Sequence, residues 1–170
     1  SLDISIEGDG FFQVLLPDGR VGYTRSGAFS RNAEGTVVTA SGYALQPEIT
    51  IPPETLTINI ASDGIVTVQV PGAVEAEEVG QITLADFPNR QGLQPNGESM
   101  LLESPASGAP IIAAPFEEGM GRTVQGSLES SNVNVVQELV DMIETQRAYE
   151  VSSKTITSVD EMMRYLAQNV

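Results

Sequence analysis

The chain has 170 residues, enough for one domain with a buried core and an appended element. Its formal net charge is −15, from 23 acidic and 8 basic residues, which disfavours binding to nucleic acid or to an anionic membrane surface. It contains no Cys and no His, which excludes disulfides and thiol nucleophiles and removes the usual zinc ligands and general base. We therefore expect no catalytic residue, no metal and no cofactor, and we expect partners that are neutral or basic.

The beginning of the chain gives no sign of a targeting segment. Its first ten residues lack the basic and apolar regions of a signal peptide. The chain also has no run of about 18 apolar residues, the length needed to span a bilayer. The chain starts at Ser1, without Met, directly in a strand-like alternation of Leu2, Ile4 and Ile6. We therefore expect it to be part of a longer protein.

Residues 1–130 are predicted to form a β-rich outer domain. Apolar runs alternate with Gly, Pro, Asn and Asp, and a turn at Pro17–Gly19 joins a strand over 11–16 to a returning strand over 21–30. Residues 47–53 are predicted to be an extended connector and residues 88–115 to be mostly irregular. The remaining strands are predicted over 36–40, 43–47, 56–60, 65–70, 79–87, 100–103 and 122–129.

Residues 131–170 are predicted to form a single long helix, from Val135 to about Gln168. Asn134 can cap it, Gln137 occupies its third position, and Glu138 lies in the first turn, where a carboxylate meets the positive helix end. At ~1.5 Å per residue the helix would be about 50 Å long. The fold class predicted is therefore mainly β, with a hairpin-rich domain followed by one long C-terminal α-helix.

One face of this helix is apolar at nearly every seventh position, which is typical of a coiled-coil seam. The seam is predicted to pack against another helix. Packing on the β domain is a second possibility, and binding to a membrane surface is disfavoured by three basic residues against six carboxylates. The predicted helix-packing residues are Val135, Leu139, Met142, Tyr149, Ile156, Val159, Met163 and Leu166.

The seam changes phase in its middle, at Gln146, Ser152 and Ser153. These residues are either simply exposed to solvent or allow helices to approach closely and set their register. A helix that packs on different neighbours along its length could use such a shift.

Two groups of polar residues in the β domain have local explanations. Asp9, Asp18 and Asp63 each precede a Gly, and turn chemistry explains them better than a calcium loop or a carboxylate active site. Arg25 and Arg31 are too few to form a nucleic-acid surface, and we expect a local ion pair within their hairpin.

Several segments together resemble the rod and hook proteins of bacterial flagella. They are GDGFFQV (8–14), YTRSGAFS (23–30), TVVTASGYALQP (36–47) and GSLESSNVNVVQELVDMIETQRAYE (126–150). Distal rod subunits of the basal body are the closest match, and a proximal rod or hook homologue is the alternative. A rival from another class is an adhesin-like binding module on a coiled-coil stalk, but the aromatic content of 5% disfavours it.

The resemblance implies a structural subunit of the drive shaft that links the motor to the hook. In such proteins an N-terminal helix pairs with the C-terminal helix inside a self-assembling helical tube, and the β domain lies outside. The implied partners are copies of the chain, other rod proteins, the hook protein and the surrounding bushing rings. The implied location is the flagellar basal body, crossing the periplasm, with export that needs no cleaved signal peptide.

Five acidic residues are candidates for a surface that faces these rings. The alternative is that these side chains are exposed to solvent and have no specific partner. They are Glu75, Glu77, Glu78, Glu117 and Glu118.

Overall fold

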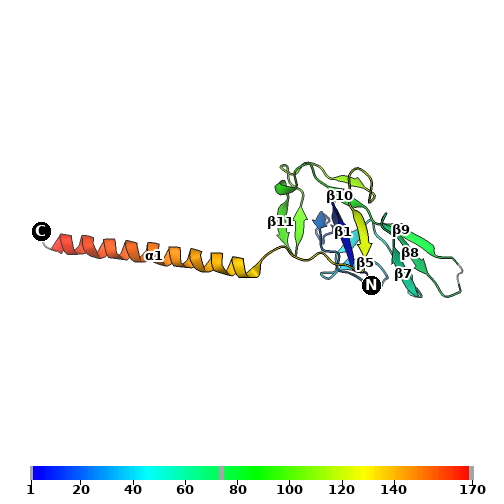
Figure 1. The fold of residues 1–170 in the computed structure, drawn as a ribbon, viewed down its shortest axis with the longest axis horizontal. Helices are drawn as coiled ribbons and strands as arrows, with labels where there is room; N and C mark the ends of the chain where they lie inside the picture. The colour runs from blue at the N-terminus through cyan, green and yellow to red at the C-terminus, as the bar shows by residue number, and fades with distance from the viewer. Residues whose placement is uncertain (1, 73–74, 169–170) are drawn as a thin grey trace. The chain divides into compact units, whose positions relative to one another are not determined.

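The computed structural model describes residues 2–72 and 75–168, with side-chain surroundings as far as residue 164. It is mainly β with one long C-terminal helix, which confirms the predicted fold class (Figure 1). The chain divides into two compact units, Ser1–Glu129 and Ser130–Val170. The strands all belong to the first unit, called the β domain here, and the helix to the second.

The described elements of the β domain are short. They are β1 (Ile4–Glu7), β2 (Phe11–Leu15), β3 (Val21–Thr24), β4 (Phe29–Arg31), β5 (Val37–Thr39), β6 (Ala44–Gln46), β7 (Thr57–Ile60), β8 (Ile65–Gln69), β9 (Glu77–Gln81), β10 (Leu84–Asp86), the 3-10 helix η1 (Arg90–Gly92), β11 (Gln94–Gly97), β12 (Met100–Leu102), β13 (Ile111–Ala113) and β14 (Arg122–Gln125).

The largest sheet branches at β2. Its path runs β11-β12-β3-β2-β6-β5-β4, and β10 and β13 extend from β2 beside that path. One edge of β2 pairs with β3, whereas the other edge is shared: Phe11 and Phe12 pair with β10, and Gln13 to Leu15 pair with β6. This sharing places β2 at the centre of the domain, and four of its five residues are buried.

The main core is aliphatic and includes two aromatic rings in contact. Phe12 and Phe29 meet edge to face with ring centroids 5.1 Å apart, and Ile49 and Ile51 are fully buried beside them in the same cluster. The predicted connector over 47–53 therefore contributes to the core. The Val37 N–H donates to the Ile49 carbonyl, and the Ile51 N–H donates to the Gly35 carbonyl, so the connector is fixed against its neighbours at 3.0 and 2.8 Å.

The predicted return strand over 21–30 was wrong in one respect, because it divides into β3 and β4. Gly27 lies between them against β1, where the Ile4 N–H donates to its carbonyl at 3.0 Å. A Cβ at Gly27 would stand 1.6 Å from the Ile4 carbonyl oxygen. The break is therefore set by a close approach of backbones that only glycine permits.

Two other predictions of strands need correction. The predicted strand over 79–87 divides into β9 and β10, which belong to different sheets. In the region over 88–115, β12 confirms the strand predicted over 100–103, but β11 and β13 were not predicted, and β13 pairs with β10. Long-range pairing creates these elements, and local sequence carries little trace of it.

The two ends of the β domain lie together. β1 pairs antiparallel with β14, with Ile4 opposite Gln125, and the Gly126 N–H donates to the Asp3 carbonyl at 2.8 Å. Residues that precede β1 and residues that follow β14 therefore leave the β domain side by side.

The helix α1 spans Val135–Gln168, as the sequence predicts. The Asn134 side-chain oxygen accepts from the N–H groups of Val136 and Gln137 at 3.1 and 3.4 Å, which confirms the predicted cap. Gln137 does not complete a capping box, because its amide donates to Asp141 at 3.0 Å instead.

Candidate functional site

The apolar residues of α1 are the main candidate interaction surface. Seven of the eight predicted seam side chains are described, and each is exposed, from 48% for Val159 to 77% for Tyr149. The side chain of Leu166 lies outside the described residues. Exposed apolar area of this extent on one element is typical of a surface that a partner covers.

The apolar surface of α1 is wider than the predicted seam. Val136, Val140 and Ile143 add to it in the first half, and Val151 and Met162 add to it in the second. Sequence reasoning that followed one seven-residue series missed these residues. Residues four, seven, eight and eleven positions after Val151 share one face of a helix, so this spacing would have revealed the apolar face of the second half. A groove on that face is lined by Val151, Lys154, Thr155, Ser158, Val159 and Met162.

Several hydroxyl groups on α1 donate hydrogen bonds within the helix. Ser152 donates to the Ala148 carbonyl at 2.9 Å, and Thr155 donates to the Val151 carbonyl at 2.8 Å. A hydroxyl that donates to the carbonyl four residues back needs no further acceptor, so a neighbouring helix can cover it at small cost. This favours the interpretation that Ser152 allows a neighbouring helix to approach closely. The same role for Ser152, Gln146 and Ser153 stays a prediction.

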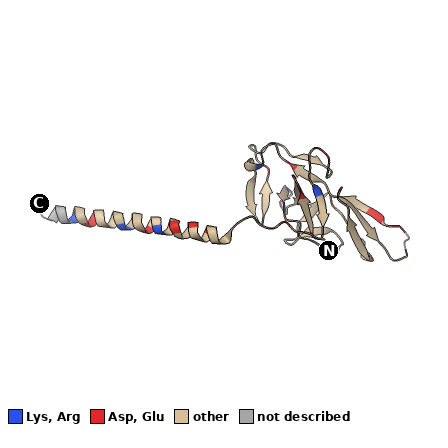
Figure 2. Ribbon diagram, in the orientation of Figure 1, with Lys and Arg blue, Asp and Glu red and all other residues tan. Residues whose placement is uncertain are grey.

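Charged residues of both signs alternate with these apolar positions along α1 (Figure 2). Arg164 and Asp160 form an ion pair one turn apart at 3.0 Å. The described part of α1 has no stretch apolar enough to cross a membrane.

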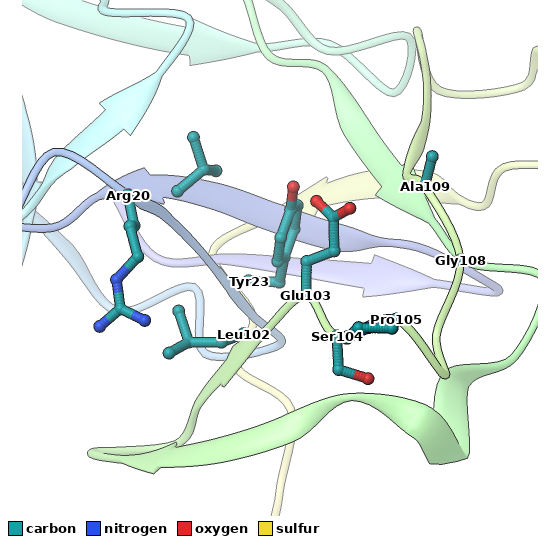
Figure 3. Close-up of a pocket in the computed structure, with 9 residues that line it drawn as sticks. Arg20, Tyr23, Leu102, Glu103, Ser104, Pro105, Gly108 and Ala109 are labelled. Carbon is teal, nitrogen blue, oxygen red and sulfur yellow. The ribbon is translucent and has the colours of Figure 1, made fainter.

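A shallow hollow of about 640 Å³ lies in the β domain and is shown in Figure 3. Tyr23 and Glu103 point the same way there, and burial, followed by the Glu103 charge, raises the pKa of Tyr23. The Ser104 hydroxyl donates to the Gly92 carbonyl and accepts the N–H groups of its own loop, so it holds the loop in place. The lining residues are Arg20, Val21, Tyr23, Leu102, Glu103, Ser104, Pro105, Gly108 and Ala109, which include no nucleophile bonded to a general base.

The turn roles predicted for the Asp-Gly pairs are confirmed at two sites. Asp18 accepts from the Arg20 N–H at 3.0 Å, and Asp63 accepts from the Ile65 N–H at 3.1 Å. Asp9 has a further role, because it binds Arg90, 81 residues away, at 2.6 Å. Arg90 also holds Asp86 through two bonds of 2.7 Å and lowers the pKa of both carboxyl groups.

The predicted ion pair within the hairpin was wrong for Arg25. Arg25 pairs with Glu129, 104 residues along the chain, and donates to three backbone carbonyls as well. Within the part of the chain that the structure describes, Arg31 has a single bond, to the Pro52 carbonyl at 3.4 Å. The difference arises because the end of β3 lies over the turn after β1, a proximity that only the folded domain creates.

The five acidic candidates are all exposed, but they do not all lie in loops. Glu77 and Glu78 belong to β9, whereas Glu75 lies in the segment before it. Glu117 and Glu118 follow β13, and Glu118 has a left-handed backbone with φ of 49°.

Comparisons with known proteins show which family this chain resembles over the β domain and the helix. Residues 5–68 match the model of the flagellar hook protein FlgE/F/G D1 domain, and residues 124–169 match that of the flagellar basal body rod FlgEFG protein C-terminal region. The chain is 49% identical over 168 residues to the flagellar basal-body rod protein FlgG of Buchnera aphidicola from Schizaphis graminum, and 43% identical over 169 residues to that of Agrobacterium fabrum. Each alignment covers 99% of this chain.

The chain therefore belongs to the family of flagellar hook and basal-body rod proteins. It is more similar to these two rod proteins than to the flagellar hook protein FlgE of Salmonella typhimurium, with which it shares 33% identity over 115 residues, 68% of this chain and 28% of the hook protein. The chain spans 65% and 64% of the two rod proteins' length.

Proposed function

We propose that the chain is the outer domain and C-terminal helix of a distal rod subunit, a structural component of the flagellar basal body. The observation that carries this proposal is a capped helix of 34 residues whose apolar side chains are exposed along its length. In proteins most of a helix's stability comes from packing of its apolar face, so the exposed apolar side chains of α1 favour a role in assembly. The similarity to two basal-body rod proteins supports the same role.

The partner of α1 is proposed to be an N-terminal helix, together with the same helices of neighbouring subunits. The pairing of β1 with β14 supports this, because a segment before residue 1 would leave the β domain beside the segment that leads to α1. About one third of each rod relative's length lies outside the region that this chain matches, which leaves room for such a helix. The phase change near Ser152 and Ser153 would let different neighbours cover the two halves of α1.

The mechanism is proposed to be mechanical, without catalysis. Packing of α1 helices forms the inner tube, β domains make lateral contacts, and torque is carried by many repeated interfaces. Other rod proteins, the hook protein and the surrounding rings are the proposed further partners, in a structure that crosses the periplasm. The five acidic candidates are proposed to keep the outer surface from adhering to those rings. If neutralising these five residues left motility and ring assembly unchanged, the proposed role of the acidic residues would be refuted.

Sedimentation tests the assignment of α1. Chains 1–170 and 1–134 are compared with and without a peptide of the segment that precedes residue 1 in the full-length protein. We expect only the longer chain to bind the peptide. A chain 1–170 with Met142, Tyr149 and Ile156 changed to Ser should lose binding, and a matched chain with Glu144 and Glu150 changed to Gln should keep it. Binding by both chains, or by neither, would contradict the proposal.

A further inference from the structure

The outer edge of β13 is an unprotected strand edge on the β domain. Among the described residues β13 pairs only with β10, so its other edge has no strand beside it. Ile111 and Ile112 are 48% and 55% exposed, and no residue from Ser104 to Phe116 carries a charge. An exposed apolar strand edge of this kind is a site where another strand adds.

Three other sheet edges in the described domain, those of β9, β11 and β7, are protected. Glu77 and Glu78 lie on β9, and Pro95 interrupts β11 beside a register shift. The Gln125 side chain covers β7 by accepting from the Ile60 N–H at 2.9 Å and donating to the Ile58 carbonyl at 3.0 Å. The contrast indicates that β13 is left open for a contact.

The turn after β13 has two features that also favour a contact with a partner at this edge. Phe116 is 60% exposed and has a left-handed backbone with φ of 72°, a conformation rare for a bulky residue. Exposed outliers of this kind concentrate at functional positions. Glu117 and Glu118 follow it, and both are exposed.

A complementary charge lies on another edge of the β domain. β4 ends the path of the largest sheet and carries Arg31. The other four arginines of the domain are held in ion pairs with carboxylates of the domain, whereas Arg31 has only its 3.4 Å bond to the Pro52 carbonyl. In a chain of net charge −15, an unpaired arginine is the group best suited to receive a carboxylate from outside.

We propose that β13 and its following turn dock on the β4 edge of a second copy of the chain. β13 adds beside β4, Phe116 packs against the neighbour, and Glu117 and Glu118 face its Arg31. The two surfaces differ, so the contact is heterologous and can repeat from one copy to the next, which gives an open helix where the rotation does not close into a ring. This inference rests on the proposed function, because it names a lateral contact between the β domains of the rod.

Cysteine cross-linking tests the contact directly, because the chain has no cysteine of its own. Two full-length variants, Ile112→Cys and Ser30→Cys, are mixed under assembly conditions and oxidised. We expect the mixed disulfide to form at least tenfold faster than either symmetric one. Asn96→Cys on the β11 edge replaces Ser30→Cys in the control and should cross-link at the background rate. Predominance of the Ile112→Cys symmetric disulfide would overturn the choice of β4.

Charge reversal gives a second test that separates the two proposals. Arg31→Glu, or Glu117→Arg with Glu118→Arg, should reduce assembly at least tenfold, and all three changes in one chain should restore it. Normal assembly of each reversed chain, with no mixed disulfide, would refute the β13–β4 contact and leave the rod assignment intact. Failure of the parent full-length protein to bind copies of itself under any condition would refute the rod assignment, and this contact with it.

Discussion

Arg25 and Glu129 form an ion pair at 2.8 Å that joins the end of β3 to the last residue of the β domain. The same guanidinium donates to the carbonyls of Ile6, Gly8 and Gly10 at 2.8 to 3.1 Å. One side chain thus binds the turn after β1 and the segment that leads toward α1. Because that segment would transmit load in a rod, its attachment to the β domain matters for the proposed function.

Arg25→Ala is expected to lower the free energy of unfolding of the β domain by about 2 kcal/mol, after allowance for the 30% exposure of the side chain. Arg25→Lys should recover less than half, because an ammonium cannot reproduce the planar fork. Urea unfolding followed by near-UV circular dichroism measures both. The matched control, Arg31→Ala, should change stability by less than about 0.5 kcal/mol. Equal effects at the two arginines would contradict the role of Arg25.

Gln125→Leu is expected to cost about 1–3 kcal/mol, because the N–H of Ile60 and the carbonyl of Ile58 lose their partner. Hydrogen exchange of the Ile60 amide should accelerate in parallel. Gln69 lies on the adjacent strand β8 with an exposed side chain, so Gln69→Leu serves as the control and should leave that exchange rate unchanged. Unchanged protection of Ile60 in Gln125→Leu would show that the amide does not cover the edge.

Gly27→Ala should destabilise the β domain by about 3 kcal/mol, because the new Cβ would stand 1.6 Å from the Ile4 carbonyl oxygen. Gly22→Ala meets its nearest atoms at 3.4 Å and should stay within about 1 kcal/mol of the parent. Thermal unfolding compares the two. Similar melting temperatures would show that β1 can move away from Gly27 without loss.

Arg90 is expected to make stability depend on pH in acid. Its hydrogen bonds lower the folded-state pKa of Asp9 and Asp86 below the ordinary value of 3.8, so this stabilisation is complete above that pH and is lost as the pH falls through the lowered pKa. Arg90→Gln should therefore flatten the acid side of the stability profile below about pH 4. Arg147→Gln on α1 is the control, and a profile in Arg90→Gln as steep as the parent's would contradict the prediction.

Ser153→Leu is expected to strengthen association of α1 helices but to produce assemblies of wrong geometry, because a large side chain at the phase change blocks close approach. Sedimentation measures the association, and electron microscopy measures the diameter and order of the tubes. Glu150→Leu changes a charged position nearby and controls for added apolar area. Normal tubes in Ser153→Leu would end the register interpretation.

Local sequence determined much of this protein. The span of α1 follows from the absence of Gly and Pro and from the Asn134 cap, both of which act within a few residues. The hairpin turns at Asp18 and Asp63 are likewise local, because each carboxylate bonds an N–H two residues away. The family resemblance also lay in contiguous motifs, so it needed no coordinates.

The tertiary structure alone decided which distant segments meet. The partner of Arg25 lies 104 residues away and that of Asp9 lies 81 residues away, and no periodicity in the chain encodes such a distance. The division of residues 21–30 into two strands depends on β1 filling the space beside Gly27, and the open edge of β13 depends on its pairing with β10. Strand pairing is set by packing across the whole domain, whereas helix and turn formation are settled by neighbours in the chain.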